Sequence, residues 1–238
     1  MNALIALMGL MAKPLSYVLT GLYSVIGNYG ITLAVITIII KLALYPLYKK
    51  QILSTVGMSD LQPRMKDIQR RYKDDPEMLR IKTAELYKES GVNPMGSCLP
   101  MFIQMFIIMG LFALLRNPMH YLDSQEMIFA IHESFLWIKD LSQPDLWILP
   151  ILTGLSTFIA FYLSQQNNAT TMPGGSQGMQ KAMMLMFPIM LVWMARSYPA
   201  GLAVYWFVGQ FVQIFFNLRF AQIRKSMNEK SKKKKRHA

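Results

Sequence analysis

The sequence predicts an all-α protein that crosses a membrane several times. Of its 238 residues, 53% are hydrophobic and only 16% are charged, whereas a soluble domain carries about a quarter of its residues as Asp, Glu, Lys or Arg. The apolar residues are gathered into five long stretches. This composition argues against a cytosolic globular enzyme and a disordered chain. The single cysteine, Cys98, excludes an internal disulfide framework.

Each of the five apolar stretches approaches the length of a transmembrane helix, which needs about 20 residues to cross a hydrocarbon core about 30 Å thick. The last two stretches are separated by Tyr198-Pro199-Ala200-Gly201, where proline and glycine favour a tight reversal over one long helix. The expected spans are residues 22–48, 97–117, 146–166, 180–198 and 200–220.

The distribution of charge predicts the orientation, because basic residues in short loops tend to remain on the cytoplasmic side. Residues 49–94 contain ten basic and seven acidic residues, and residues 219–238 contain nine basic and one acidic residue. The segment 118–145 carries one basic and five acidic residues, so it is predicted to be extracellular. Five spans with both basic segments inside place the N-terminus outside and the C-terminus in the cytoplasm.

Residues 1–21 are predicted to form a helix that lies at the outer membrane interface. The apolar run 1–12 is too short for a sixth span, and it ends at Lys13-Pro14. It also lacks the basic region that begins a signal peptide, so we do not expect a cleaved leader.

Residues 49–94 predict a cytoplasmic helical hairpin. Its first helix presents an apolar stripe at helical spacing, while Arg64, Arg70 and Arg71 lie mostly on other faces. Asp75 and Pro76 supply an N-cap and a first-turn proline for the second helix. The hairpin could be a charged spacer or a docking surface. The stripes are Leu61, Met65, Ile68 and Tyr72 on the first helix and Leu79, Thr83, Leu86 and Tyr87 on the second.

Two further polar segments are predicted on the cytoplasmic side. Residues 167–179 contain small and amide side chains with no charge, which is typical of a flexible loop. Residues 221–238 form a basic tail that could contact ribosomal RNA phosphates or anionic lipid, or could be a disordered anchor. The tail's candidate contact residues are Lys232, Lys233, Lys234, Lys235 and Arg236.

Lys41 is the most informative residue within the expected spans. Inserting an ammonium group into the hydrocarbon costs about 2.5 to 3.5 kcal/mol, so its side chain either extends toward the cytoplasmic surface or faces a water-filled cavity. Polar residues on four spans favour the cavity, although each alone would be an ordinary helix contact. The candidate residues of this hydrophilic pocket are Lys41, Thr32, Thr37, Gln104, Ser156, Thr157, Tyr205, Trp206, Gln210 and Gln213.

The residues missing from the spans exclude several kinds of function. The five stretches contain no Asp or Glu, which disfavours a proton relay or sodium-coupled transport. All three histidines lie outside the spans, so no Ser-His dyad or HExxH zinc site can form there. We therefore expect no enzyme activity, cofactor, metal or small-molecule substrate.

A set of motifs between about residues 20 and 220 resembles the YidC/Oxa/Alb family of membrane protein insertases, most closely its short Gram-positive form. Their order and spacing are specific. The motifs are Gly27-Asn28-Tyr29-Gly30, Tyr45-Pro46-Leu47, Tyr72-Lys73-Asp74-Asp75-Pro76, Gly91-Val92-Asn93-Pro94, Cys98-Leu99-Pro100 and Pro199-Ala200-Gly201-Leu202 with Tyr205-Trp206.

The resemblance implies five helices around a hydrophilic groove that is open to the cytoplasm and lipid and closed outside, in a bacterial plasma membrane. By this resemblance, Lys41 occupies the position of a positive residue in the family's first span. Trp206 corresponds to an aromatic residue of the fifth span that lines the groove. The implied partners are nascent membrane proteins and lipid, with the ribosome and the Sec translocon as further candidates.

The chain departs from the family at several groove positions. The family's cation is usually arginine, whose bidentate hydrogen bonding Lys41 lacks; Phe106 and Ala160 replace a proline and a glutamine. A small passive channel or scramblase-like conduit and a ribosome-recruiting scaffold are the alternative functions.

Overall fold

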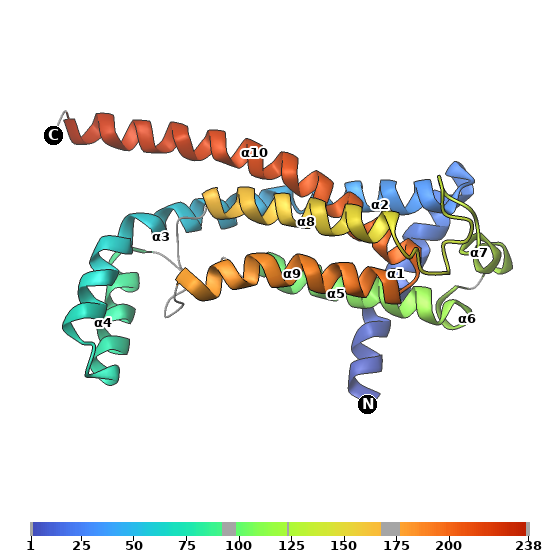
Figure 1. Cartoon of the computed structure of the whole chain (residues 1–238), viewed down its shortest axis with the longest axis horizontal. Helices are drawn as coiled ribbons and strands as arrows, with labels where there is room; N and C mark the ends of the chain where they lie inside the picture. The colour runs from blue at the N-terminus through green and yellow to red at the C-terminus, as the bar shows by residue number, and fades with distance from the viewer. Residues whose placement is uncertain (1, 92–98, 123, 168–176, 237–238) are drawn as a thin grey trace.

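The computed structural model describes residues 2–91, 99–122, 124–167 and 177–236, and every regular element in these ranges is an α-helix. The helices lie mostly along one long axis (Figure 1). The elements are α1 (Asn2–Ile26), α2 (Tyr29–Ala43), α3 (Tyr45–Arg71), α4 (Pro76–Glu89), α5 (Leu99–Arg116), α6 (Pro118–Tyr121), α7 (Gln125–Ala130), α8 (Ile148–Asn167), α9 (Gln177–Ser197) and α10 (Ala200–Arg236).

The bundle has two distinct ends (Figure 1). At one end, α6, α7 and the chain that follows them cover the helices; we call it the loop end. At the other end, α3 and α4 form a hairpin and α10 extends past the bundle; we call it the hairpin end. Helix α1 crosses the direction of the other helices and packs against α5 and α2.

A sharp break separates α1 from α2. Helix α1 continues to Ile26, five residues beyond the expected interfacial segment 1–21. Gly27 then adopts a φ of 67°, a left-handed conformation that glycine enters without steric cost. The Asn28 side chain caps α2 by accepting a hydrogen bond from the Ile31 N–H at 3.0 Å.

The expected first span, residues 22–48, is therefore not one helix. Its first residues belong to α1, its middle is α2, and its end is the first turn of α3. Pro46 lies in that first turn, where its missing N–H is tolerated, so a new helix begins at Tyr45. Helix α3 then continues without interruption into the predicted hairpin and ends at Arg71.

The hairpin of α3 and α4 confirms the predicted start of its second helix. The Asp75 side chain accepts a hydrogen bond from the Met78 N–H at 2.9 Å, and Pro76 is the first helical residue. The two helices pack through the expected stripes: the Thr83 hydroxyl donates to Met65 Sδ at 3.8 Å, and the Leu86 side chain is buried.

Helix α10 joins the expected last span and the basic tail into one element. The prediction separated them at residue 220, but α10 runs from Ala200 to Arg236. Lys, Arg and Glu are good helix formers, and neither glycine nor proline occurs after Gly209. The predicted flexible loop 167–179 falls mainly on residues 168–176, outside the described residues, and Gln177 already belongs to α9.

Within the described residues, the segment Ala200–Ile223 is the one helical segment that is long and apolar enough to cross a bilayer by itself. Four shorter apolar helical segments lie within or overlap the other expected spans. They are Tyr29–Ala43, Phe102–Leu115, Ile148–Ser164 and Met184–Ser197.

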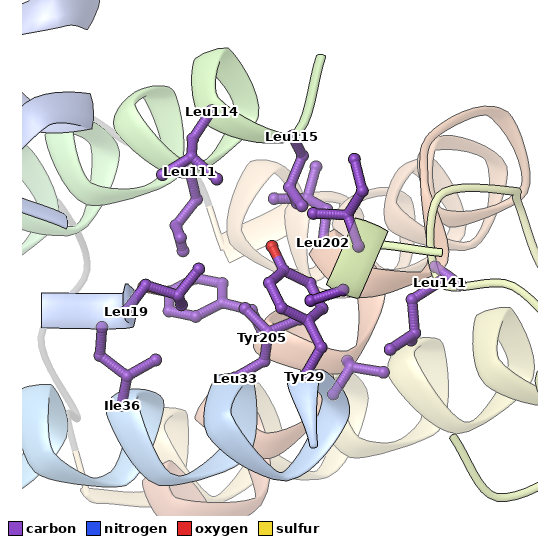
Figure 2. Close-up of a cluster of buried hydrophobic side chains, with 14 of the residues drawn as sticks. Leu19, Tyr29, Leu33, Ile36, Leu111, Leu114, Leu115, Leu141, Leu202 and Tyr205 are labelled. Atoms are coloured by element: carbon purple, nitrogen blue, oxygen red, sulfur yellow. The ribbon is translucent and has the colours of Figure 1, made fainter. Parts of the chain in front are cut away.

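The main core lies near the loop end, where α1, α2, α5 and α10 converge (Figure 2). Helix α10 also packs against α8, and α8 packs against α9. Small residues permit these approaches: a Cβ on Gly154 of α8 would lie 2.4 Å from Val192 Cγ2 of α9. The core side chains include Leu19, Tyr29, Leu33, Ile36, Leu111, Leu114, Leu115, Leu141, Leu202 and Tyr205.

Candidate functional site

Lys41 lies in the last turn of α2, and only 6% of the residue is exposed. Its Nζ lies 3.5 Å from Tyr48 Oη on α3 and 3.5 Å from Gln213 Oε1 on α10. The Tyr48 ring centre is 5.3 Å away, within cation–π range. The side chain thus reaches Tyr48 and Gln213 and stays buried among groups from three helices.

A chain of amide side chains connects Lys41 to α8. The Gln213 Nε2 donates to Asn217 Oδ1 at 3.2 Å, and Asn217 Nδ2 donates to the Ala160 carbonyl oxygen at 2.8 Å. Asn217 is 3% exposed. Because a buried amide without partners is costly, this chain stabilises a polar layer that joins α2, α10 and α8. We call Lys41, Tyr48, Gln213 and Asn217 the lysine network.

Thr37 lies one turn before Lys41 but does not contact its ammonium group. Its hydroxyl donates to the Leu33 carbonyl oxygen at 2.6 Å, within α2. A Cβ added at Gly209 would lie 3.6 Å from Thr37 Cγ2 and 3.4 Å from Lys41 Cε. The lysine stem and the Thr37 methyl group therefore lie beside α10 at Gly209, at distances that an alanine methyl group would also accept.

Gln104 and Tyr205 form a second polar contact, between α5 and α10. Gln104 Nε2 donates to Tyr205 Oη at 2.9 Å, and Tyr205 is 2% exposed. The Gln104 Oε1 is buried and has no hydrogen-bond partner among the described residues. Tyr205 is a member of the main core, and this contact is separate from the lysine network.

A third polar group lies where α8 meets α10. The Ser156 hydroxyl donates to the Thr153 carbonyl oxygen at 3.0 Å. In contrast, the hydroxyls of Thr153 and Thr157 and the indole N–H of Trp206 are buried without partners among the described residues. A cavity of about 20 Å³ beside Thr153 and Trp206 has room for about one water molecule. Its other walls are Leu191, Met194, Ala195, Tyr198, Leu202 and Ala203.

The predicted pocket residues therefore form three groups around α10 instead of one lining. Trp206, Gln210, Gln213 and Asn217 follow one another at intervals of four, three and four residues, which places them along one face of α10. Gln210 is half-buried on that face. The structure brings Lys41 to the hairpin-end part of this face, and Trp206 lies nearer its loop end.

Gln213 was among the polar residues predicted to line the pocket, but Tyr48 and Asn217 were not, although all three provide the groups around Lys41. The helical spacing from Gln210 and Gln213 to Asn217 is a signal that could have found Asn217. Tyr48 had no such signal, because the break at Leu44 places it on a different helix from Lys41.

Glu133 connects the loop end to both helices of the α1–α2 corner. Its Oε2 accepts a hydrogen bond from the Tyr29 N–H, the first residue of α2, at 2.7 Å, and its Oε1 accepts one from the Tyr23 hydroxyl on α1. A carboxylate at a helix N-terminus is favoured by the helix dipole. In the sequence, Glu133 is recognisable only as one acidic residue of the loop.

The same loop also holds the start of α10. The Ala200 and Gly201 N–H groups donate to the carbonyl oxygens of Gln143 and Leu141, each at 2.9 Å. These hydrogen bonds satisfy N–H groups that have no partner inside the helix. The loop thus contacts α1, α2 and α10 and covers the loop end of the bundle.

Two aspartates stabilise the loop by accepting several hydrogen bonds. Burial alone would raise the pKa of Asp140, but bonds from Ser142 and His132 lower it below its ordinary value of 3.8. Burial likewise opposes ionisation of Asp145. Bonds from the Trp137 indole and from N–H groups at the start of α8 nevertheless lower the pKa of Asp145.

The predicted hairpin and tail residues lie apart from these groups. Arg64, Arg70 and Arg71 are exposed on α3. Arg70 Nη2 lies 3.4 Å from Asp67 Oδ1, an exposed pair that contributes little stability. Tyr72 is half-buried beside the end of α3. The tail residues 232–236 continue α10, and their side chains lie outside the described part of the chain.

Residues 21–229 match the family described as 60Kd inner membrane protein. A membrane protein insertase YidC of Geobacter sp. (strain M21) is 38% identical over 207 residues, which cover 87% of this chain and 36% of the relative. A membrane protein insertase YidC of Fusobacterium nucleatum is 36% identical over 206 residues, which cover 86% of this chain and 92% of the relative.

A crystal structure of an active YidC insertase with the first transmembrane domain resolved is similar to this structure. The TM-score is 0.61 at 27% sequence identity, and the match covers 84% of this chain and 44% of that one. The chain spans about a third of the length of relatives such as the Geobacter protein and most of the length of the Fusobacterium protein. The chain therefore belongs to the YidC/Oxa/Alb family of bacterial membrane proteins, over residues 21–229.

Proposed function

We propose that this chain is a membrane protein insertase that inserts nascent membrane proteins into the bacterial plasma membrane and helps them to fold. The observation that carries the proposal is the buried ammonium group of Lys41, which neutral polar groups surround inside an apolar helix bundle. The relatives' printed name, membrane protein insertase YidC, supports the same activity for this chain.

The proposed topology has five spans. They are α2 with the first turn of α3, then α5, α8, α9 and α10 as far as about Ile223, while α1 lies at the outer interface. The acidic loop is outside, and the hairpin, the basic tail and the C-terminus are cytoplasmic. The charge distribution supports this orientation.

In this proposal, a polar groove at α10 receives the substrate from the cytoplasmic side. Lys41 attracts the acidic or polar N-terminal flank of the substrate, and its hydrophobic segment moves into lipid. Groove-facing roles are proposed for Thr37, Gln104, Ser156, Thr157, Tyr205, Trp206 and Gln210. The lysine network near the hairpin end and the covered loop end both support entry from the cytoplasm.

The length of a proposed span supports a low free-energy barrier for moving the substrate's polar flank across the membrane. Helix α5, the second proposed span, has 18 residues, about 27 Å at 1.5 Å per residue, whereas a bilayer core is about 30 Å thick. A short span favours local thinning of the bilayer. A membrane potential of 100 mV supplies about 2.3 kcal/mol for each charge that crosses, so one or two acidic residues can be drawn outward without a covalent step.

The proposed partners are the substrate and the lipid bilayer, with the ribosome contacting the basic tail and the Sec translocon as a further candidate. The hairpin residues Arg64, Arg70, Arg71, Tyr72, Asp75 and Pro76 would form the cytoplasmic receiving element.

Lys41 variants in an insertase-depleted strain test the proposal. Lys41→Arg keeps the charge and should preserve insertion of a single-span substrate with an acidic N-terminal flank. Lys41→Ala and Lys41→Glu should reduce it by about tenfold or more, the scale of one charge interaction in a low dielectric. Full insertion with all three variants would contradict the proposal. Substrate-independent lipid or ion flux through reconstituted protein would favour the conduit instead.

A further inference from the structure

The Lys41 ammonium group has neutral acceptors and no acidic counter-ion. Its hydrogen-bond partners are the hydroxyl of Tyr48 and the amide oxygen of Gln213, both at 3.5 Å. Among the described residues, none of the ion pairs includes Lys41. The surrounding groups therefore orient the ammonium group without neutralising its charge.

The Gln213 amide is held in one orientation. Its Nε2 donates to Asn217 Oδ1 at 3.2 Å, and Asn217 in turn donates to the Ala160 carbonyl oxygen at 2.8 Å. A backbone carbonyl can only accept, so it fixes which end of the Asn217 amide faces α8 and, through it, which end of Gln213 faces Asn217. The Gln213 oxygen is thereby directed at Lys41.

The Lys41 ammonium group has one hydrogen-bond donor left for a ligand. An ammonium group has three N–H donors, and the two described oxygen partners use two of them. The third donor is the one with which an incoming carboxylate or carbonyl oxygen could form a charge-assisted hydrogen bond.

We propose that Gln213 and Asn217 are positioning residues, which hold the Lys41 ammonium group at the α2–α10 interface as an uncompensated charge that selects acidic substrate flanks. This inference rests on the proposed insertase function and deepens it. Gln213 acts through Lys41, and Asn217 acts through Gln213. A carboxylate at position 213 would hold the ammonium group equally well but would neutralise it.

The test compares two single-span substrates that differ only in an acidic or a neutral N-terminal flank. Gln213→Glu is nearly isosteric, and it should reduce insertion of the acidic-flank substrate by about tenfold, because a like charge then faces the flank. Insertion of the neutral-flank substrate should decrease less, so that the ratio of acidic-flank to neutral-flank insertion falls. Gln222→Glu is the matched control, since Gln222 is exposed on the same helix and outside the lysine network.

Two further variants test the positioning role: a substitution of Asn217, and a double substitution that moves the cation from position 41 to position 213. Asn217→Leu leaves Gln213 free to turn, so it should weaken the preference for acidic flanks severalfold. Lys41→Gln combined with Gln213→Lys returns one cation to the same interface and should recover part of the preference that Lys41→Gln alone removes. The melting temperature and membrane abundance of each variant separate loss of preference from loss of folding.

Each result has a distinct meaning. If Gln213→Glu keeps the wild-type preference while Lys41→Ala loses insertion, the positioning role is wrong and the insertase function stands. If Gln213→Glu and Gln222→Glu reduce insertion equally, the effect is one of added negative charge in general, and the positioning role is again wrong. If Lys41→Ala inserts both substrates fully, the proposed function itself fails.

Discussion

Gly30 shows how one residue without a side chain positions the loop on the helix bundle. It lies in the first turn of α2, and a Cβ added there would come within 2.3 Å of the Phe135 ring. The ring therefore packs directly against the α2 backbone. In the same segment, Glu133 accepts its hydrogen bond from the adjacent Tyr29 N–H.

Gly30→Ala should destabilise the protein by about 1 to 3 kcal/mol, because Phe135 must move away from the new methyl group. Gly21→Ala is the matched control. Gly21 is also helical, but a Cβ there meets nothing within 4 Å, so alanine should stabilise α1 by up to about 1 kcal/mol. Melting temperatures in detergent measure both effects, and equal shifts would contradict the proposed contact.

Among single residues, Lys41 could be singled out from the sequence because a charged side chain in an apolar segment is costly to insert into a membrane. The sequence alone could not identify the partners of Lys41. Tyr48 and Gln213 reach it from two other helices, and the pairing depends on how α2, α3 and α10 pack. Thr37 lies one turn from Lys41, but its hydroxyl bonds to its own helix rather than to the ammonium group.

Among the elements, the segment between α5 and α8 connects four helices by hydrogen bonds. Glu133 joins α1 and α2, while Leu141 and Gln143 accept hydrogen bonds from the start of α10. Helix α8 is held in turn by Asp145, which accepts a hydrogen bond from the Leu149 N–H at 2.9 Å. Helix ends that would otherwise leave N–H groups unpaired are thus satisfied by one segment.

Glu133→Gln should lower the stability of the bundle by about 1 to 2 kcal/mol, since it removes a charge-assisted bond and a favourable helix-dipole interaction at the start of α2. Glu126→Gln is the control, because Glu126 is exposed in the same loop. Hydrogen exchange of the α2 N-terminal amides, faster in the Glu133 variant alone, would locate the effect. Unchanged exchange in both would show that Glu133 does not stabilise this corner.

The loop should also respond to acid. The pKa values of Asp140 and Asp145 are both lower than 3.8 in the folded protein. Their contribution to stability is therefore complete above about pH 4 and is lost as the pH falls through the folded-state pKa values. Trp137 donates to Asp145, so its fluorescence should change below pH 4. An unchanged acid transition in Asp145→Asn would contradict this assignment.

The helix boundaries that the sequence predicted well depend on local chemistry. Asp75 with Pro76, and Pro199 between two apolar stretches, act within a few residues of themselves. The break at Gly27 and Asn28 carries similar local signals, but an apolar segment of span length concealed it. The predicted last helix ended at residue 220, where the apolar run gives way to basic residues. Helix α10 continues to Arg236 because these basic residues have a similar helix propensity.

At the scale of the whole molecule, most of the net charge of +12 lies in two segments at the hairpin end, +3 in residues 49–94 and +8 in residues 219–238. This asymmetry is what the proposed orientation rests on. The hairpin and the extended α10 project from the same end of the bundle (Figure 1). A partner with a negative surface could contact both segments.

Replacing Lys232, Lys233, Lys234, Lys235 and Arg236 with alanine should reduce cosedimentation with ribosomes severalfold at low salt. It should also flatten the salt dependence, because fewer counterions are released from phosphate. When the variant with the five tail alanines is overproduced, it should still insert substrates, and adding Lys41→Ala should still reduce that insertion. Cosedimentation that is unchanged by the replacement would assign the tail to lipid or to topology instead.

A substrate path beside the lysine network is tested most directly by site-specific photocrosslinking to a stalled nascent membrane protein. A photoreactive residue at position 210, on the polar face of α10, should crosslink to the substrate's flank and hydrophobic segment. The same probe at position 25, exposed on α1, should not. Position 210 crosslinks should decrease by about tenfold when Lys41→Glu is introduced. Equal crosslinking from both positions, or crosslinking that Lys41→Glu leaves unchanged, would contradict a substrate path beside the lysine network.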